Sequence, residues 1–202
     1  MRRSLALACL LAVSLLACSG KGRPARQPLN VLLITVDTLR YDRVGFLDPR
    51  HLRTPNLDAL AARSLVFTRA FAHNPVTLPS HANILTGSTP LRHGISDNSG
   101  YRLDGRFTSL ASLLKGRGYE TAAFVGAFPL DSRFGLDQGF DLYDDDLGGS
   151  GGNEFLFVER PADKVVAPAM AWLGARSGKW FAWIHLFDPP HPYPPPPPQR
   201  EA

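Results

Sequence analysis

Cysteine is nearly absent from this sequence of 202 residues, and its two copies, Cys9 and Cys18, both stand close to the start. The chain after Cys18 therefore has no thiol for a disulfide bond, a cysteine zinc cluster or a cysteine nucleophile. Any chemistry that this part performs depends on oxygen and nitrogen groups.

An excess of basic residues is also absent from the body of the chain, although the formal net charge is +4. Five of the 22 Lys and Arg residues precede the first acidic residue, which leaves 17 cations against 18 anions in the remainder. A nearly neutral body gives no support to a nucleic-acid partner. The hydrophobic fraction of 44% and the charged fraction of 20% exclude wholesale disorder.

The first residues have the pattern of an export signal. Two arginines precede an apolar run over 5–17, which is too short to span a bilayer comfortably. Residues 15–18, Leu-Leu-Ala-Cys, resemble the lipobox of bacterial lipoproteins. We expect residues 1–18 to be a lipoprotein-type signal peptide with Cys18 as the lipidation site, although a plain secretory signal is the alternative. The protein would then be exported, periplasmic or at the cell surface, and anchored to the membrane by lipid, with 19–28 as a polar tether.

From residue 29 the hydrophobic pattern alternates between strands and helices. Apolar runs typical of strands buried on both faces alternate with amphipathic runs that begin at cap residues or proline. This alternation predicts an α/β domain over 29–188, with a mostly parallel sheet and helices on both faces. The expected strands cover 29–36, 65–72, 120–125 and 180–187, and the expected helices cover 54–61, 79–86, 108–115 and 161–176.

Two segments lack this alternation. Residues 144–153 combine acidic residues with a glycine-rich run, which predicts a flexible and solvated surface loop. Residues 189–202 contain eight prolines in 14 positions, which predicts an extended or disordered tail outside the core.

Two expected elements place reactive side chains where ligands bind in α/β folds. Asp37 follows the first expected strand, and a carboxylate at the carboxyl end of a strand suits a hard metal ion, although it suits a helix cap equally well. Thr77 precedes a proline-started helix, where free N–H groups and the macrodipole favour an anion. A metal or a base can activate such a hydroxyl as a nucleophile, whereas Thr77 or Ser80 as an ordinary helix cap is the alternative.

The third candidate segment is His-Leu-Phe-Asp-Pro-Pro-His-Pro-Tyr over 185–193, at the exit of the last expected strand. His191 is placed there to donate a hydrogen bond to an oxygen of a sulfate or phosphate group. His185 lies inside the apolar run and is predicted to be a core histidine with satisfied hydrogen bonds.

In this order the three segments resemble the sulfatases and their relatives in the alkaline phosphatase superfamily. The resemblance covers about 29–193, and its most specific parts are the strand ending in Asp37, the segment 54–61 and the segment 77–87. It implies an alkaline phosphatase-like fold that is incomplete at the C-terminus. It also implies metal-assisted attack on a sulfate or phosphate ester through a covalent enzyme intermediate.

The resemblance assigns roles to four residues. Asp37 is implied as a ligand of a divalent metal, which would be calcium, manganese or zinc. Thr77 is implied as a further ligand and as the nucleophile, and His191 as a group that binds the ester oxyanion. Asn98 is a further candidate for contacting the oxyanion, as in phosphonate and phosphodiester relatives.

The sequence also departs from the sulfatase pattern. Sulfatases that use formylglycine carry Cys or Ser at the position of Thr77, within Cys-x-Pro-x-Arg, and this segment has Thr-Leu-Pro-Ser-His. Threonine cannot form that aldehyde, so no formylglycine is expected. Sulfatases usually begin with paired aspartates, and Val36 fills the first place; their Gly-Lys-Trp-His segment appears here as Gly-Ala-Phe-Pro over 126–129. Thr77 suits a branch of the superfamily that mainly cleaves phosphodiesters or transfers phosphoryl groups.

Three functions are consistent with these observations. The first is a sulfatase-like hydrolase of sulfate esters. The second is a phosphodiesterase, phosphonate monoester hydrolase or phosphoethanolamine-type transferase that uses the same residues. The third is a non-catalytic surface lipoprotein that binds glycans or anions. The remaining metal ligands of the family come from a later strand, so we expect the 202-residue chain to be truncated and inactive by itself.

Replacing Cys18 with alanine is expected to release the protein from membranes, because the lipid on Cys18 would be its anchor. Partition between the detergent and aqueous phases of an extract measures this, with Cys9→Ala as the control. Unchanged partition of Cys18→Ala would show that a lipid on Cys18 is not the anchor.

Overall fold

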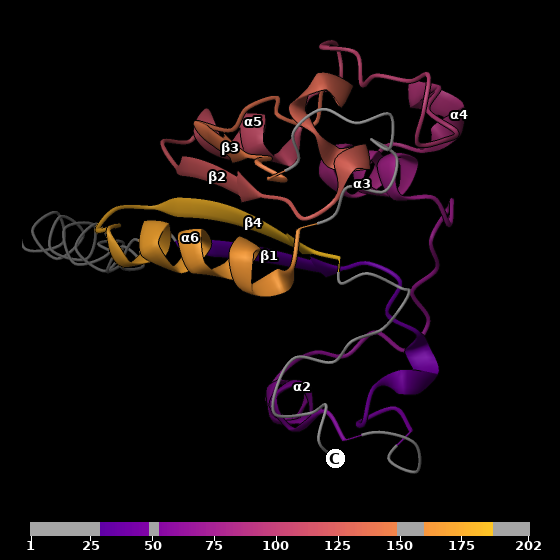
Figure 1. The fold of residues 1–202 in the computed structure, drawn as a ribbon, viewed down its shortest axis with the longest axis vertical. Coiled ribbons are helices and arrows are strands. Elements are labelled where there is room, and N and C mark those ends of the chain that lie inside the picture. Colours follow the sequence, from indigo (N-terminus) through magenta and orange to yellow (C-terminus); the bar gives the residue numbers. More distant parts are fainter. Residues whose placement is uncertain (1–28, 49–52, 149–159, 188–202) are drawn as a thin grey trace, which may run out of the picture.

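The computed structural model describes residues 29–48, 53–148 and 160–187 (Figure 1). The predictions for the signal peptide with Cys18, the tether, His191 and the proline-rich tail lie outside these residues. One parallel sheet runs through the described part, with the strand order β1-β4-β2-β3. The strands are β1 (Val31–Val36), β2 (Glu120–Phe124), β3 (Leu142–Asp144) and β4 (Trp180–Leu186).

Strand β4 is central, because it pairs in parallel with β1 on one side and with β2 on the other. Its five middle residues are buried, as expected of a strand covered on both faces. The register joins Val31 to Phe181 at one end of β1 and Val36 to Leu186 at the other. The carboxyl ends of β1 and β4 therefore reach the same edge of the sheet.

Helices cover both faces of the sheet, as the sequence predicted (Figure 1). Helix α6 (Ala162–Gly174) packs on one face through Val165 and Ala169. Helices α3 (Thr77–Thr86) and α5 (Leu110–Lys115) pack on the other face, where the larger core forms around Trp183. The described part also contains α2 (Pro55–Ala61), α4 (Pro90–His93) and the 3-10 turns Tyr41–Arg43, Phe128–Leu130 and Ser132–Phe134.

The outer face of β1 is apolar and uncovered in the described part of the chain. Leu32, Ile34 and Val36 alternate onto the face that α6 covers elsewhere, yet they are 46%, 52% and 46% exposed. The reason is that α6 packs mainly over β4 and β2. Folded proteins normally pair or cover such an apolar edge strand.

The strand expected over 65–72 is wrong. Residues 65–72 form turns and irregular chain, and Leu65, Phe67 and Phe71 are 81%, 76% and 83% exposed. Within the described residues their apolar run has no neighbouring strand to complete its hydrogen bonds, because α2 lies away from the sheet and this run follows α2 in the chain (Figure 1).

The loop expected over 144–153 begins inside β3, a strand that was not predicted from the sequence. Asp144 is the last residue of β3, and its carboxylate accepts two hydrogen bonds from the Arg160 guanidinium, at 2.8 and 3.1 Å. The Asp145 carboxylate accepts a hydrogen bond from the N–H of Ser132 at 2.8 Å. Of the three aspartates expected to be solvated, only Asp146 is exposed.

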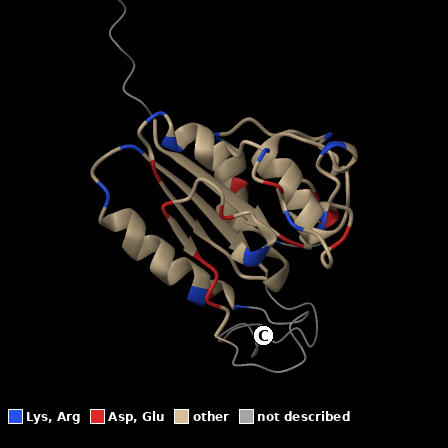
Figure 2. Ribbon diagram, turned by 90° about the horizontal axis from the view of Figure 1, so that it is seen from above, with Lys and Arg blue, Asp and Glu red and all other residues tan. Residues whose placement is uncertain are grey.

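Charged residues lie in several loops and at helix ends, with Lys and Arg interspersed among Asp and Glu (Figure 2). This distribution agrees with the nearly neutral charge of the body of the chain. Among the helices of the described residues, none is both long enough and apolar enough to cross a membrane.

Candidate metal centre and nucleophile

Asp37 and His185 lie side by side at the carboxyl edge of the sheet. The N–H of Asp37 continues the β1–β4 pairing by donating to the carbonyl of Leu186 at 2.9 Å. His185 is opposite Thr35 in the register, so the side chains of Thr35, Asp37 and His185 share the face covered by α3. Beneath them the indole of Trp183 donates to the Thr35 hydroxyl at 3.0 Å.

His81 brings a second imidazole to this edge from helix α3. Leu78, Ala82 and Leu85 anchor the helix in the core, which turns His81 toward the sheet. Its ring is 4% exposed and lies edge-on to the His185 ring, with 4.8 Å between the centroids. In the sequence His81 stands where the sulfatase motif has arginine, and no role was predicted for it. The spacing of four residues from Thr77 was the available signal, since it places both on one helix face.

Three polar atoms without hydrogen-bond partners meet at this point. One carboxylate oxygen of Asp37 and one nitrogen each of His81 and His185 lie within 4.8 Å of one another. Among the described residues, Asp37 Oδ2 and the Nε2 atoms of both histidines are buried without a partner. The gap of 3.6 Å between Asp37 Oδ2 and His185 Nε2 is too long for a hydrogen bond. Each such atom costs about 1–3 kcal/mol, so the cluster calls for a ligand, and a divalent cation fits its donors.

His185 is therefore buried, as predicted, but its hydrogen-bonding groups are not all satisfied. It is fully buried in β4, yet its Nε2 atom has no partner. The apolar run of the sequence shows the burial of this histidine. It cannot show the unpaired nitrogen, because Asp37 and His81 come from distant parts of the chain.

The protonation of the cluster suits a cation. Burial, with a smaller effect of His185, lowers the pKa of His81 to about 4, so this imidazole is neutral near pH 7. Burial by itself raises the pKa of Asp37, but His185, His81, Thr77 and the Thr38 N–H together lower it below its usual value. The cluster thus presents a carboxylate and a neutral imidazole, which are the forms that bind metals.

The backbone holds the Asp37 carboxylate in one orientation. Thr38 has a φ of 56°, and among the described residues it is the one non-glycine residue with positive φ. This is an uncommon conformation for a β-branched residue, and it places the Thr38 N–H 2.8 Å from Asp37 Oδ1. The other oxygen, Oδ2, is left to face the two histidines.

Thr77 is the first residue of α3, two positions before the proline expected to begin the helix. Thr77 is half-buried, and its side chain is one of the groups that lower the pKa of Asp37, so its hydroxyl lies near the carboxylate. Asn98 also lies at this helix start, where its Oδ1 accepts a hydrogen bond from the N–H of Leu78 at 2.8 Å. Because Pro79 has no N–H, fewer donors are free for an anion than the sequence suggested.

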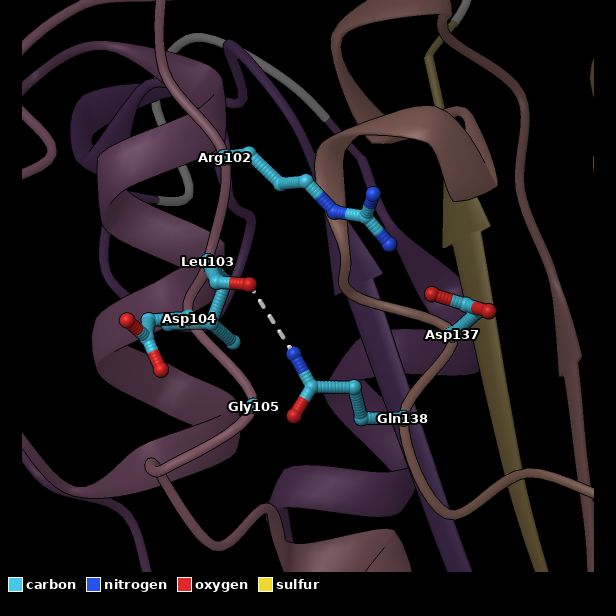
Figure 3. A pocket seen from close by; sticks show the side chains of 6 residues that line it. All are labelled: Arg102, Leu103, Asp104, Gly105, Asp137 and Gln138. Carbon is cyan, nitrogen blue, oxygen red and sulfur yellow. Dashed lines mark hydrogen bonds between the residues drawn. The ribbon is translucent and has the colours of Figure 1, made fainter.

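A separate hollow of about 450 Å³ lies elsewhere on the molecule (Figure 3). In it the side chains of Arg102 and Asp137 extend toward each other, and Gln138 Nε2 donates to the Leu103 carbonyl at 3.0 Å. Its lining shares no residue with the cluster at Asp37. The lining residues are Arg102, Leu103, Asp104, Gly105, Asp137 and Gln138.

The fold and the cluster define an α/β protein with a candidate metal centre and a hydroxyl at the carboxyl edge of a parallel sheet. The sulfatase family model matches residues 29–202. The chain therefore belongs to the sulfatase family. The predicted family and the predicted α/β fold are confirmed.

The chain is similar to the front part of longer proteins. It is 33% identical over 147 residues to N-acetylgalactosamine-6-sulfatase of Sus scrofa, which is 65% of this chain and 28% of that protein. It is 37% identical over 115 residues to iduronate 2-sulfatase of Mus musculus, which is 56% of this chain and 21% of that protein. The crystal structure of the phosphonate monoester hydrolase of Agrobacterium radiobacter matches with a TM-score of 0.68 at 24% identity, over 86% of this chain and 44% of that one. The chain thus spans less than half the length of each.

Asn98→Ala is expected to lower the free energy of unfolding by about 1–2 kcal/mol, because the Leu78 N–H at the start of α3 loses its acceptor. Asn98→Asp keeps an oxygen at that place and should retain most of the stability. Urea unfolding measures both, with the exposed Asn56→Ala as a control that should change stability by less than about 0.5 kcal/mol. An equal loss in Asn98→Asp would contradict the capping role.

Proposed function

We propose that this chain carries the nucleophile of an exported hydrolase that cleaves sulfate esters. The observation that carries the proposal is the meeting of Asp37, Thr77 and two buried histidines at the carboxyl edge of the sheet. Two relatives, named as N-acetylgalactosamine-6-sulfatase and iduronate 2-sulfatase, support a sulfate ester as the substrate class. Export and anchoring through a lipid on Cys18 are proposed with it.

Asp37 and a ring nitrogen would hold the divalent cation, with Thr77 beside them. When bound, such a cation supplies Lewis acidity that lowers the pKa of a nearby hydroxyl. Of the three metals considered, zinc or manganese fits a nitrogen donor better than calcium, which takes oxygen ligands.

Thr77 is the residue of this chain that would react. Its Oγ1 atom attacks the sulfur of the ester in line with the departing alcohol oxygen and the S–O ester bond breaks. The sulfuryl group is left on Thr77, and the proton lost by the hydroxyl ends on the departing alcohol. Water then releases sulfate and restores the hydroxyl. The Asp37 carboxylate beside Thr77 keeps the hydroxyl oriented, and the buried residues of α3 shield it from one side. We propose that His191 donates to an oxygen of the ester.

A second candidate is hydrolysis of phosphodiesters or phosphonate monoesters, or phosphoryl transfer. Thr77 favours it, because threonine cannot provide the formylglycine of sulfatases. The same residues would attack phosphorus in place of sulfur. A lipoprotein that binds glycans or anions without catalysis is the third possibility, and it predicts no turnover of either ester.

Thr77→Ala is expected to lower turnover by about 10³-fold or more while the fold stays intact, because the attacking atom is lost. Thr77→Ser should keep part of the activity. The assay is release of nitrophenol from sulfate and phosphodiester esters, in a version that spans the length of the relatives, with circular dichroism to monitor folding.

Thr86→Ala is the matched control, because Thr86 ends the same helix and its hydroxyl bonds only locally. It donates to the Ala82 carbonyl at 2.6 Å and accepts from the Ser88 N–H at 3.2 Å. This variant should leave turnover within a few fold. Normal turnover by Thr77→Ala would show that Thr77 is a structural residue of α3, and that the proposed mechanism is wrong.

A further inference from the structure

The two histidines of the cluster differ in the hydrogen bond that each Nδ1 atom makes. His81 Nδ1 lies 2.8 Å from the carbonyl oxygen of Thr77. A carbonyl oxygen only accepts, so His81 Nδ1 carries the hydrogen. The Nε2 atom of this neutral ring then has a free lone pair, and it is the atom that is buried without a partner.

His185 has the opposite arrangement. The backbone N–H of Gly126 donates to His185 Nδ1 at 3.3 Å. An amide N–H only donates, so His185 Nδ1 holds the lone pair and its Nε2 carries the hydrogen. That Nε2–H faces Asp37 Oδ2, which is 3.6 Å away and can accept it after a small side-chain shift.

Gly126 is closely packed at this position. A Cβ atom there would come within 3.2 Å of the His185 and Arg160 carbonyl oxygens and 3.3 Å of Val165. The Gly126 carbonyl accepts a hydrogen bond from the N–H of Arg160 at 2.9 Å. These contacts fix the N–H donor that faces His185.

We infer that His81 Nε2 and Asp37 are ligands of the metal, and that His185 is a positioning residue that donates to Asp37. The inference rests on the proposed metal site. It separates the residues that bind the metal directly from a residue that only hydrogen-bonds to one of these ligands. A hydrogen-bonded carboxylate ligand is a common arrangement in metal sites, because the second group fixes the orientation of the first. Asp37 would then be held on both oxygens, by Thr38 and by His185.

The alternative, in which His185 also binds the metal, has a physical cost. His185 Nε2 would have to give up its hydrogen, and Nδ1 would then carry one. Two N–H donors, from Nδ1 and from Gly126, would face each other at a fully buried residue. Both would be unsatisfied, which is unfavourable away from water.

Zinc affinity of matched variants tests the inference, measured by competition with a chromophoric chelator. His81→Gln should weaken zinc binding by about 100-fold or more, because a ligand is lost. His185→Gln keeps an N–H donor near the place of Nε2 and should stay within about fivefold of the unsubstituted protein, whereas His185→Leu should lose about 10–100-fold. His93→Gln, at a buried histidine on α4, should leave zinc affinity unchanged.

An equal loss in His81→Gln and His185→Gln would overturn the inference and leave the metal site standing. No zinc binding by the unsubstituted protein would overturn the proposed metal site itself. If a variant fails to fold, long-range ¹H–¹⁵N correlation of the metal-free, unsubstituted protein decides the question. It should show His81 with its hydrogen on Nδ1 and His185 with its hydrogen on Nε2, and the same tautomer in both would contradict the inference.

Discussion

The parallel pairing of β1 with β4 is the contact on which the candidate site depends. It is formed by segments about 150 residues apart, and its register sets Thr35 beside His185 and the Asp37 N–H on Leu186. Because side chains alternate along a strand, this register turns Asp37 and His185 to the face where α3 lies. A shift of one residue would turn Asp37 to the opposite face and separate it from both histidines.

The cluster of Asp37, His81 and His185 buries polar atoms without hydrogen-bond partners, which costs stability. This cost is the physical reason to regard the cluster as functional. A core that only needed stability would hold apolar residues at His81 and His185, as it does at the neighbouring Ala82 and Trp183. The sequence keeps three unpaired polar atoms there, with the Thr77 hydroxyl beside them. In the proposed site, a bound cation would satisfy Asp37 and His81 and activate the hydroxyl, while His185 donates to Asp37. The same ligand would then serve both stability and chemistry.

The sequence predicted those features that a local pattern determines. The apolar runs identified β1, β2 and β4, and the end of the first run identified Asp37. The hydrophobic pattern failed where strand pairing determines whether a segment forms a strand. Residues 65–72 are as apolar as a strand but pair with no strand of the described sheet, and β3 is only three residues long. His81 was missed for a related reason: its closeness to Asp37 and His185 arises from tertiary packing, which no spacing along the chain records. For the same reason the loop prediction at Asp144 did not foresee its ion pair with Arg160.

The most direct measurement is an anomalous-difference electron-density map from crystals of the protein grown with zinc, collected at the zinc absorption edge. The account predicts a single strong peak between the Asp37 carboxylate and His81 Nε2, with Thr77 beside it and His185 Nδ1 still bonded to the Gly126 N–H. A map without a peak at this edge of the sheet, or with zinc bound by His185 and not by His81, would contradict it.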